Sequence, residues 1–498
     1  MKHRSLLLLV LVLFDVFCVS AQNTDQLLEA ARKERRQILE MSENFRQEVK
    51  RQWMEYLSKP WVPVEADEVL RRPLEEHPEM PMMVLESYDY DVGETYEIPS
   101  HVLDLDRSMY QDDYFSTFPV FEETTDGDSQ INVSLNGFEL AVRFPEEGRV
   151  ALEGTARADI LSALEHMLEC SYTNTLRDLS KAREILSLSD WSFVSLVEGL
   201  SDAVYGTDSK MEPVLLQAYL LNQFDFHLCL GCTGGGRLYK MMRADASMYD
   251  FVPYIYEDTC FYVIDDEYVD DCEPMSMIDL PSDSKRPLRM RINPDEKFYV
   301  RASKEMKFSP SRYPNLFMSV TTDVSRMEFY SDYLMFYTEG EPLTTYFHYA
   351  MLPASEEVIR DVYPVLRQAV AGRSELEAVN ILLNVVQTSF PYRSDKDAWG
   401  YERYFFADEL WYYGGGDCED KSILFSRLVR DILGLPVALV YWPGHLSCAV
   451  CFPDDVKGAY FTVGNDRYVS CDPTYENRFA GAVMSNYKTM DAELILLQ

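Results

Sequence analysis

The chain has 498 residues, of which 47% are hydrophobic and 13% aromatic, and its formal net charge at pH 7 is −37. This length and hydrophobic content predict a globular protein of several domains with sizeable cores. The strong negative charge repels phosphate backbones and anionic membrane surfaces, so it excludes nucleic acid as an expected partner and favours a soluble protein.

Residues 1–21 carry a basic start, a short apolar run and the small residues Val19, Ser20 and Ala21 before Gln22. This pattern predicts a cleaved secretory signal peptide; an uncleaved membrane anchor is the alternative. No later stretch reaches the length of about 20 apolar residues that a spanning helix needs. We therefore expect an exported protein, either periplasmic or extracellular and associated with the cell envelope, with no transmembrane segment after signal cleavage.

Residues 22–59 are expected to form one long amphipathic helix. The stretch 24–58 holds no Pro or Gly, and its apolar side chains recur at helical spacing, at Ile38, Met41, Phe45, Val49 and Trp53. Such a helix packs on another part of the protein or on a partner, for example an envelope protein. Residues 60–130 are rich in Pro and acidic side chains with little periodicity, which predicts an extended linker.

Residues 131–275 are predicted to form an α/β domain. A hairpin turning at Asn136–Gly137 comes first, followed by helical patterns and then by aromatic, strand-like pieces. Residues 276–350 are rich in strand-forming side chains and are expected to connect two globular parts. The segment from Gly206 aligns with the segment from Gly416 at an offset of 210, with Asp208 at the position of Cys418. The middle domain is therefore a candidate degenerate copy of the last one, although any helix followed by a strand produces part of this match.

A glycine-rich loop introduces the most informative helix of the chain. Three glycines precede Asp417, which with Asp420 forms an N-cap pattern, and Cys418 then lies in the first turn of a helix ending near Gly434. The helix dipole and the free N–H groups lower the pKa of such a thiol and can receive an oxyanion. Because Glu419 and Asp420 oppose a thiolate, a cationic partner is needed.

His445 is the expected partner of this thiol, because it follows a strand-like run and a turn, and starts a second alternating run. Asp472 ends the next strand candidate, so antiparallel pairing of 445–452 with 467–473 would bring its carboxylate beside the imidazole. The same pairing predicts Cys448 and Cys471 as cross-strand neighbours behind the site, either as a disulfide or as packed sulfurs.

Three segments, GGGDCEDKSILFSRLVR, GHLSCAV and YVSCDPTY, together resemble the transglutaminase-like superfamily, in which Cys, His and Asp follow in this order on a papain-like core. The chain also looks like the exported transglutaminase-like domain proteins of Bacteroidetes. The resemblance implies a multi-domain α+β protein whose residues 351–498 form a transglutaminase-like domain.

The implied chemistry is acyl transfer through a thioester, with Cys418 as nucleophile, His445 as general base and then acid, and Asp472 as the residue that orients the imidazole. No cofactor and no metal are implied. Transfer to water makes the protein a peptidase or amidase, whereas transfer to an amine makes it a cross-linking enzyme. We favour hydrolysis of a protein, peptide or cell-wall peptide substrate.

Other sites are weaker. Disulfides or buried thiols are preferred over a zinc site for Cys229, Cys232, Cys260 and Cys272, because the metal-knuckle spacing exists on one side only. The run Gly231–Gly236 lacks the Lys and the Ser or Thr of a phosphate loop, and the acidic run 264–273 lacks a calcium loop, so both are read as turns or solvated loops. The rival function is a catalytically idle scaffold or binding protein. Burial of the Cys418 side chain inside the core, or a separation of more than about 6 Å from the ring of His445 with no room to close that gap, would end the enzymatic interpretation.

Overall fold

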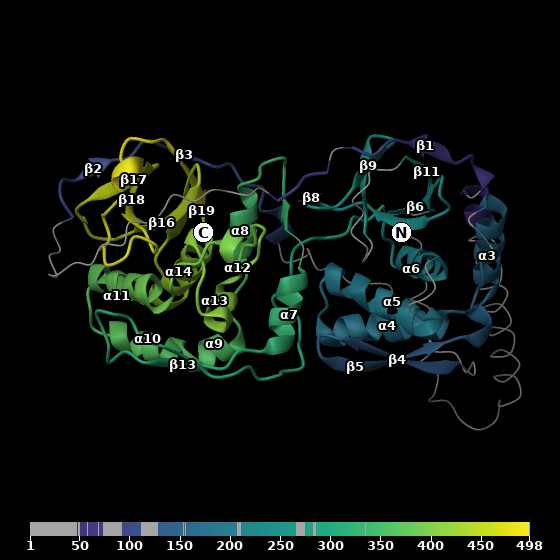
Figure 1. Cartoon of the computed structure of the whole chain (residues 1–498), viewed down its shortest axis with the longest axis horizontal. Helices are drawn as coiled ribbons and strands as arrows, with labels where there is room; N and C mark the ends of the chain where they lie inside the picture. The colour runs from purple at the N-terminus through teal and green to yellow at the C-terminus, as the bar shows by residue number, and fades with distance from the viewer. Residues whose placement is uncertain are drawn as a thin grey trace, which may run out of the picture. The chain divides into compact units, whose positions relative to one another are not determined.

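The structure is a computed structural model that describes residues 47, 50–56, 58–67, 69–72, 92–110, 128–152, 154, 156–206, 211–264, 274–281, 285–333 and 335–497 (Figure 1). The chain divides into two compact units, residues 1–60 and 61–498. Residues 50–56, within the predicted amphipathic helix, are helical. The predicted signal peptide and most of that helix lie outside the described residues. The α+β class is confirmed, because helices and mainly antiparallel sheets both occur.

The middle part of the chain begins with the predicted hairpin. Strands β4 (Ser129–Leu135) and β5 (Phe138–Phe144) are joined by Asn136 and Gly137, whose φ angles are 50° and 79°. Two positive φ angles are what a two-residue type I′ turn requires, and Asn-Gly accepts them readily. A short 3-10 helix, η2 (Glu146–Gly148), follows. The predicted helical patterns then form α3 (Arg157–Glu169), α4 (Thr173–Leu186), α5 (Asp190–Tyr205) and α6 (Glu212–Gln223).

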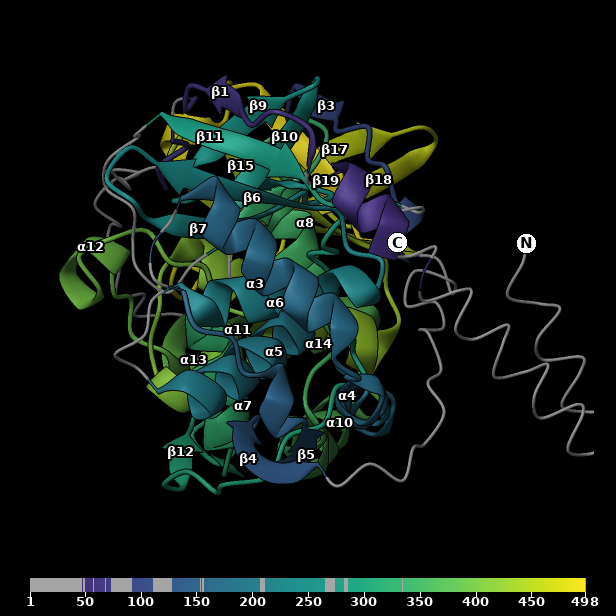
Figure 2. The same ribbon diagram turned by 90° about the vertical axis from the view of Figure 1, so that its right-hand side faces the viewer.

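A six-stranded sheet follows these helices in the order β1-β11-β6-β7-β10-β9. Its strands are β1 (Val62–Val64), β6 (Leu228–Thr233), β7 (Leu238–Met242), β9 (Pro253–Tyr256), β10 (Thr259–Val263) and β11 (Met275–Asp279). Figure 2 shows β1 beside β11, with which it pairs. An isolated bridge from Ala66 to Tyr254 joins the chain after β1 to the opposite edge of the sheet, so the sheet curls onto itself.

The region 276–350 differs from its prediction. Short strands do occur, but α7 (Val324–Asp332) and α8 (Thr344–Met351) replace the predicted strands in its second half. Asp323 caps α7 by accepting from the amide of Ser325, a local signal that outweighs the strand preference of the aromatic side chains around it. The strands are β12 (Met306–Phe308), β13 (Met318–Val320) and β14 (Phe336–Tyr337), which pairs with β8 (Ser247–Met248).

The last part of the chain packs helices against a seven-stranded sheet ordered β2-β17-β18-β16-β15-β19-β3. Its helices are α9 (Glu356–Asp361), α10 (Tyr363–Val370), α11 (Glu375–Ser389), α12 (Asp395–Ala398), α13 (Ala407–Tyr413) and α14 (Cys418–Leu433). Its strands are β2 (Tyr96–Glu97), β3 (Ser100–Val102), β15 (Val437–Trp442), β16 (His445–Cys451), β17 (Ala459–Val463), β18 (Asp466–Cys471) and β19 (Ala492–Leu496), and η3 (Ser485–Tyr487) precedes β19. The predicted helix from Asp417 to Gly434 and the predicted pairing of 445–452 with 467–473 are therefore present.

The predicted linker 60–130 is not simply a connection between domains. Besides β1 it supplies β2 and β3, which pair in parallel with opposite edges of the seven-stranded sheet, β17 and β19, and it adds η1 (Ser108–Tyr110). Between these strands, the amide of Ile98 donates to the carbonyl of Tyr460, and the carbonyl of Pro99 accepts from Ala492. One short segment therefore closes the sheet, with Ile98 buried in its core.

The two sheets share a strand order. Around the hairpin β6-β7, strands β10 and β9 follow on one side and β11 on the other; around β15-β16, strands β18 and β17 follow on one side and β19 on the other. Helix α6 precedes the first hairpin as α14 precedes the second. A duplication would produce this order, and the degenerate copy stays a hypothesis. Asp208, which aligns with Cys418, lies outside the described residues.

We expect the change Ile98→Ala to destabilise residues 61–498 by about 2–5 kcal/mol, because Ile98 is 1% exposed and fills the closed sheet. Val102→Ala on the same segment is the matched control, since Val102 is 45% exposed and its truncation should change the unfolding free energy by less than about 0.5 kcal/mol. Urea unfolding measures both, and equal effects would contradict the closing role of Ile98.

Candidate active site

The glycine loop before Cys418 is packed too closely for side chains. A Cβ on Gly416 would lie 2.3 Å from a carboxylate oxygen of Asp420, and one on Gly415 would lie 2.9 Å from the carbonyl oxygen of Pro391. The Asp420 carboxylate accepts hydrogen bonds from the amides of Asp417 and Phe405 at 3.2 and 2.9 Å. The predicted capping pattern of Asp417 and Asp420 is therefore present and fixes the start of α14.

Cys418 lies in the first turn of α14, as predicted, and is fully buried. Its thiol donates to Oε2 of Glu419 at 3.0 Å, and its Sγ accepts from the amide of Leu446 at 3.5 Å. Burial raises the pKa of the Cys418 thiol well above its usual value, and the Asp417 carboxylate adds to this. The lowered pKa expected from the helix dipole is therefore wrong for this closed state, because excluding water from the sulfur outweighs the dipole.

His445 starts β16 and Asp472 directly follows β18, which pair in register from Cys448–Cys471 to Cys451–Tyr468. The strand ends therefore meet, and His445 Nε2 lies 2.9 Å from Asp472 Oδ2. The other oxygen, Oδ1, accepts from the amide and hydroxyl of Thr474 and from the amide of Tyr475. Burial acts to raise the pKa of Asp472, but the imidazole and these hydrogen bonds bring it below its usual value.

The imidazole is held by aromatic rings as well as by the carboxylate. Its ring stacks on Tyr487 and on Trp442, with centroid separations of 5.0 and 6.0 Å, and those two rings also stack on each other at 4.9 Å. Nδ1 of His445 is buried and has no hydrogen-bond partner among the described residues. The structure thus brings His445 and Asp472 into contact and places Cys418 beside Leu446, the residue after His445.

Buried carboxylates surround the thiol. Asp395, Asp417 and Glu419 form the one group among the described residues whose ligand atoms lie close enough together to hold a metal ion. The buried Lys421 lies nearby; burial lowers its pKa to about 8, while Glu476, Asp472, Asp417 and Asp420 oppose that shift. The site therefore holds several buried carboxylates, and the amine of Lys421 offsets part of their negative charge.

The cysteines outside the triad follow the sequence analysis in part. Cys448 and Cys471 are register partners on β16 and β18, as predicted, and both are buried free thiols. Cys229, Cys232 and Cys260 are free as well, so the alternative of disulfides is not seen among them. Cys272 and the acidic run near it fall outside the described residues. The run Gly231–Gly236 ends β6 and turns into β7, as predicted.

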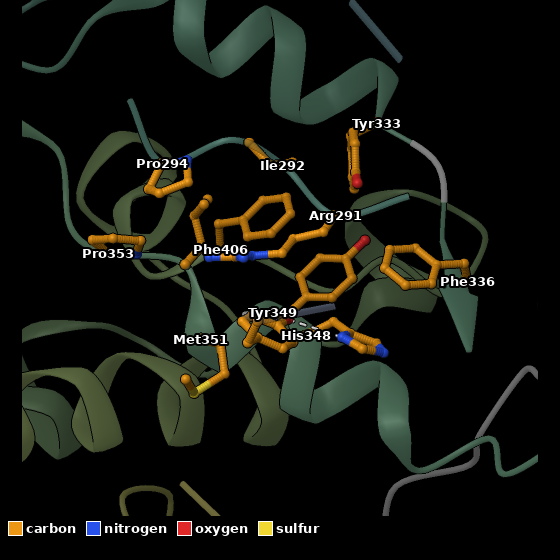
Figure 3. A pocket seen from close by; sticks show the side chains of 12 residues that line it. Arg291, Ile292, Pro294, Tyr333, Phe336, His348, Tyr349, Met351, Pro353 and Phe406 are labelled. Carbon is orange, nitrogen blue, oxygen red and sulfur yellow. Dashed lines mark hydrogen bonds between the residues drawn. The ribbon is translucent and has the colours of Figure 1, made fainter. Parts of the chain in front are cut away.

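Two cavities bear on the site. The one in Figure 3 lies among Tyr110, Arg291, Tyr333 and His348, away from the triad, and its volume of about 20 Å³ suits about one water. A larger cavity of about 260 Å³ lies against Gly415 and Gly416 in the loop that leads into Cys418, walled by Trp399, Phe405 and Tyr413. Of these two cavities, the second is the one that lies against the loop leading into Cys418, so it offers the nearer approach to the thiol.

Sequence reasoning missed Tyr487 and the buried amides of α11. Tyr487 follows the last predicted site residue, in a segment without a clear periodicity, so it offered little signal. The amides are different. Asn380, Asn384 and Gln387 interrupt an otherwise apolar helix at spacings of four and three, so they share one buried face. That pattern of polar residues on a buried face could have marked them.

No family model and no curated protein matches the sequence of this chain. Among the described residues, no helix combines the length and the apolar character that crossing a membrane requires. The geometry of the site therefore has to carry the functional argument together with the sequence motifs.

We expect the change Gly416→Ala to lower stability by about 1–3 kcal/mol, because the new Cβ displaces the Asp420 carboxylate from the two buried amides that it caps. Gly235→Ala is the matched control, since its Cβ would meet only the hydroxyl of Thr233 at 3.8 Å. Thermal unfolding compares the two, and a Gly416→Ala protein as stable as the control would contradict the close packing of the loop.

The lowered pKa of Lys421 predicts how the stability of the protein changes with pH. This pKa is lowered from 10.5 to about 8 in the folded protein, so between these values the unfolded chain binds more protons and stability rises with pH. We expect the wild type to gain roughly 3 kcal/mol over Lys421→Gln on going from about pH 7.5 to above pH 10. Urea unfolding of both proteins at each pH tests this, and a constant difference would refute it.

Proposed function

We propose that residues 351–498 form a transglutaminase-like cysteine enzyme that acts on amide or peptide bonds through a thioester at Cys418. The observation that carries the proposal is the buried hydrogen bond between His445 and Asp472, next to a sulfur that contacts the amide of Leu446. The ordered Cys, His and Asp motifs and their resemblance to the superfamily support the same assignment. Hydrolysis is favoured over transfer to an amine.

The tautomer of the imidazole follows from its hydrogen-bond partner. The pKa of Asp472 lies below its usual value, so at neutral pH this carboxylate is ionised and only accepts hydrogen bonds. Nε2 of His445 therefore carries the proton in the hydrogen bond to Oδ2. In this tautomer the lone pair lies at Nδ1, which has no hydrogen-bond partner among the described residues, and Nδ1 is the general base in this proposal.

The chemistry begins when Nδ1 takes the thiol proton and the sulfur attacks the acyl carbon, forming a C–S bond and a tetrahedral oxyanion. Backbone N–H groups near the start of α14 stabilise that charge. Collapse breaks the C–N bond, and Nδ1–H protonates the leaving amine. Water then attacks the thioester, giving its proton to Nδ1, and the acid leaves as the thiol is restored.

Access is the main requirement of this proposal. Cys418 and His445 are 0% and 1% exposed, so a substrate reaches the sulfur only after its cover moves. The cavity against Gly415 and Gly416 is the nearest starting point for such an opening. The predicted signal peptide supports export to the periplasm or the cell envelope, and the predicted helix of residues 22–59 would be available for an envelope partner.

A catalytically idle scaffold is the second candidate. The observation that favours it is the full burial of Cys418, which the sequence analysis gave as evidence against an enzyme, together with the hydrogen bond from its thiol to Glu419. The two candidates differ in whether Cys418 reacts in the folded protein. Thiol labelling and turnover therefore separate them.

We expect Cys418 to be alkylated by iodoacetamide in the folded wild type, and a fluorescent protein substrate or cell-wall peptides to be hydrolysed. Cys418→Ala and His445→Ala should each lower turnover by about 10³-fold or more. His445→Ala should also slow alkylation of Cys418, because the base that takes the thiol proton is lost. Peptide mass spectrometry identifies the labelled cysteine.

Cys451→Ser is the matched control, since this half-buried thiol lies on the same strand, β16, and should be replaceable without loss of turnover. Adding a primary alkylamine separates hydrolysis from transfer, because a transferase would incorporate the amine. A folded wild type in which Cys418 stays unlabelled across about pH 6–9, and in which no substrate is consumed, would leave the scaffold as the better description.

A further inference from the structure

A row of buried amides runs along α11. Asn380, Asn384 and Gln387 are 2%, 0% and 0% exposed, in a helix whose other buried side chains are mainly apolar. Burying an amide costs free energy unless it is hydrogen-bonded, so each of these side chains requires a partner. The partners of two of them belong to one segment, residues 472–480, which begins at Asp472.

Gln387 makes the densest of these contacts. Its Nε2 shares two N–H donors among three carbonyl oxygens, those of Asp472 at 2.9 Å, Tyr475 at 2.8 Å and Arg478 at 3.2 Å. Farther along the helix, Asn380 accepts from the amide of Ala480 at 2.8 Å. The amide of Gln387 therefore hydrogen-bonds to three carbonyls of the segment 472–480, including that of its first residue. Asn380 hydrogen-bonds only to its last residue, Ala480.

The orientation of the Gln387 amide is fixed by its surroundings. Three carbonyl oxygens only accept hydrogen bonds, so the group that faces them has to be the NH₂ and not the oxygen. Oε1 then points away and has no hydrogen-bond partner among the described residues. A buried carbonyl without a partner costs about 1–3 kcal/mol, so an apolar side chain would fill the space without this penalty. What an apolar side chain lacks is the donor to the carbonyl of Asp472.

The Gln387 amide and the turn at Thr474 and Tyr475 both hydrogen-bond to Asp472, one to its main chain and the other to its carboxylate. On its side chain, Asp472 Oδ1 accepts from Thr474 and Tyr475, which leaves Oδ2 for the imidazole; on its main chain, the carbonyl is held by Gln387. With both ends of the residue held, the carboxylate has little freedom to swing away from His445. Lys421 of α14 also approaches this helix, since its Nζ donates to the main-chain carbonyl of Gln387 at 3.4 Å.

We propose that Gln387 is a positioning residue that holds Asp472 in hydrogen-bonding line with His445. An effect of Gln387 on catalysis rests on the function proposed above, whereas its effect on the position of Asp472 does not. Loss of this contact leaves the carboxylate of Asp472 freer to move, and a misplacement of about 1 Å in a catalytic group can cost about 100-fold in rate. The consequence is a less well oriented imidazole in a site whose substrate contacts are unchanged.

The test compares Gln387→Met with Asn380→Leu in the full-length mature chain. Methionine keeps the length of the side chain but has no donor, so we expect kcat to fall about 10- to 100-fold with KM within about twofold of the wild type. Asn380→Leu removes a buried amide on the same helix face and should lower stability without a comparable change in kcat. Circular dichroism and thermal unfolding establish that both variants fold.

A second readout does not depend on turnover. In a histidine-selectively labelled protein, proton NMR reports the Nε2–H of His445, whose signal lies far downfield while it is bonded to a buried carboxylate. We expect Gln387→Met to shift or broaden this signal and Asn380→Leu to leave it in place. An unchanged signal in Gln387→Met overturns the inference, even if the wild type is active. If the wild type consumes no substrate, the proposed function fails, and the NMR comparison alone decides the role of Gln387.

Discussion

The site depends on one buried hydrogen bond, between the first residue of β16 and the residue that follows β18. Neighbouring side chains on a strand point to opposite faces, so a slip of one residue between these strands would turn Asp472 away from His445. The pairing of Cys448 with Cys471 fixes that register, and burial on both faces of the sheet makes a slip costly. The strand register and the packed core of the sheet therefore set the distance between the imidazole of His445 and the carboxylate of Asp472.

The electrostatics of the thiol are decided by burial. A helix N-terminus stabilises a negative charge by about 0.3–1 kcal/mol, and by up to about 2 kcal/mol in favourable partly buried geometries. Removing a charge from water costs several kcal/mol. At Cys418 the second effect is larger, and the carboxylate of Asp417 adds to it, so the thiol is neutral in the closed site. In the function proposed above, a thiolate forms there only as a partner of the imidazolium, so that proposal makes His445 essential to the reactivity of Cys418.

Local signals made the core of the site predictable. Glycines, a capping pattern and an apolar face defined α14, and alternation with a Pro-Gly turn defined β15 and β16. The strands β2 and β3 could not be predicted, because they are two and three residues long and their partners lie more than 350 residues away in sequence. Helix α7 was misjudged because its aromatic side chains favour strands, while a cap at Asp323 and tertiary packing favour the helix. The amides of α11 had a readable pattern whose partners only the fold reveals.

The buried site holds two complementary groups. The thiol of Cys418 donates to Glu419, while Nδ1 of His445 is a buried acceptor without a partner among the described residues. Thiol hydrogen bonds are weak, whereas an unsatisfied buried acceptor costs about 1–3 kcal/mol. Side chains exchange between staggered rotamers, so a rotamer that turned the sulfur from Glu419 toward His445 would recover that cost. In the proposed enzyme, reactivity also requires movement of the cover that excludes substrate and water from the buried sulfur.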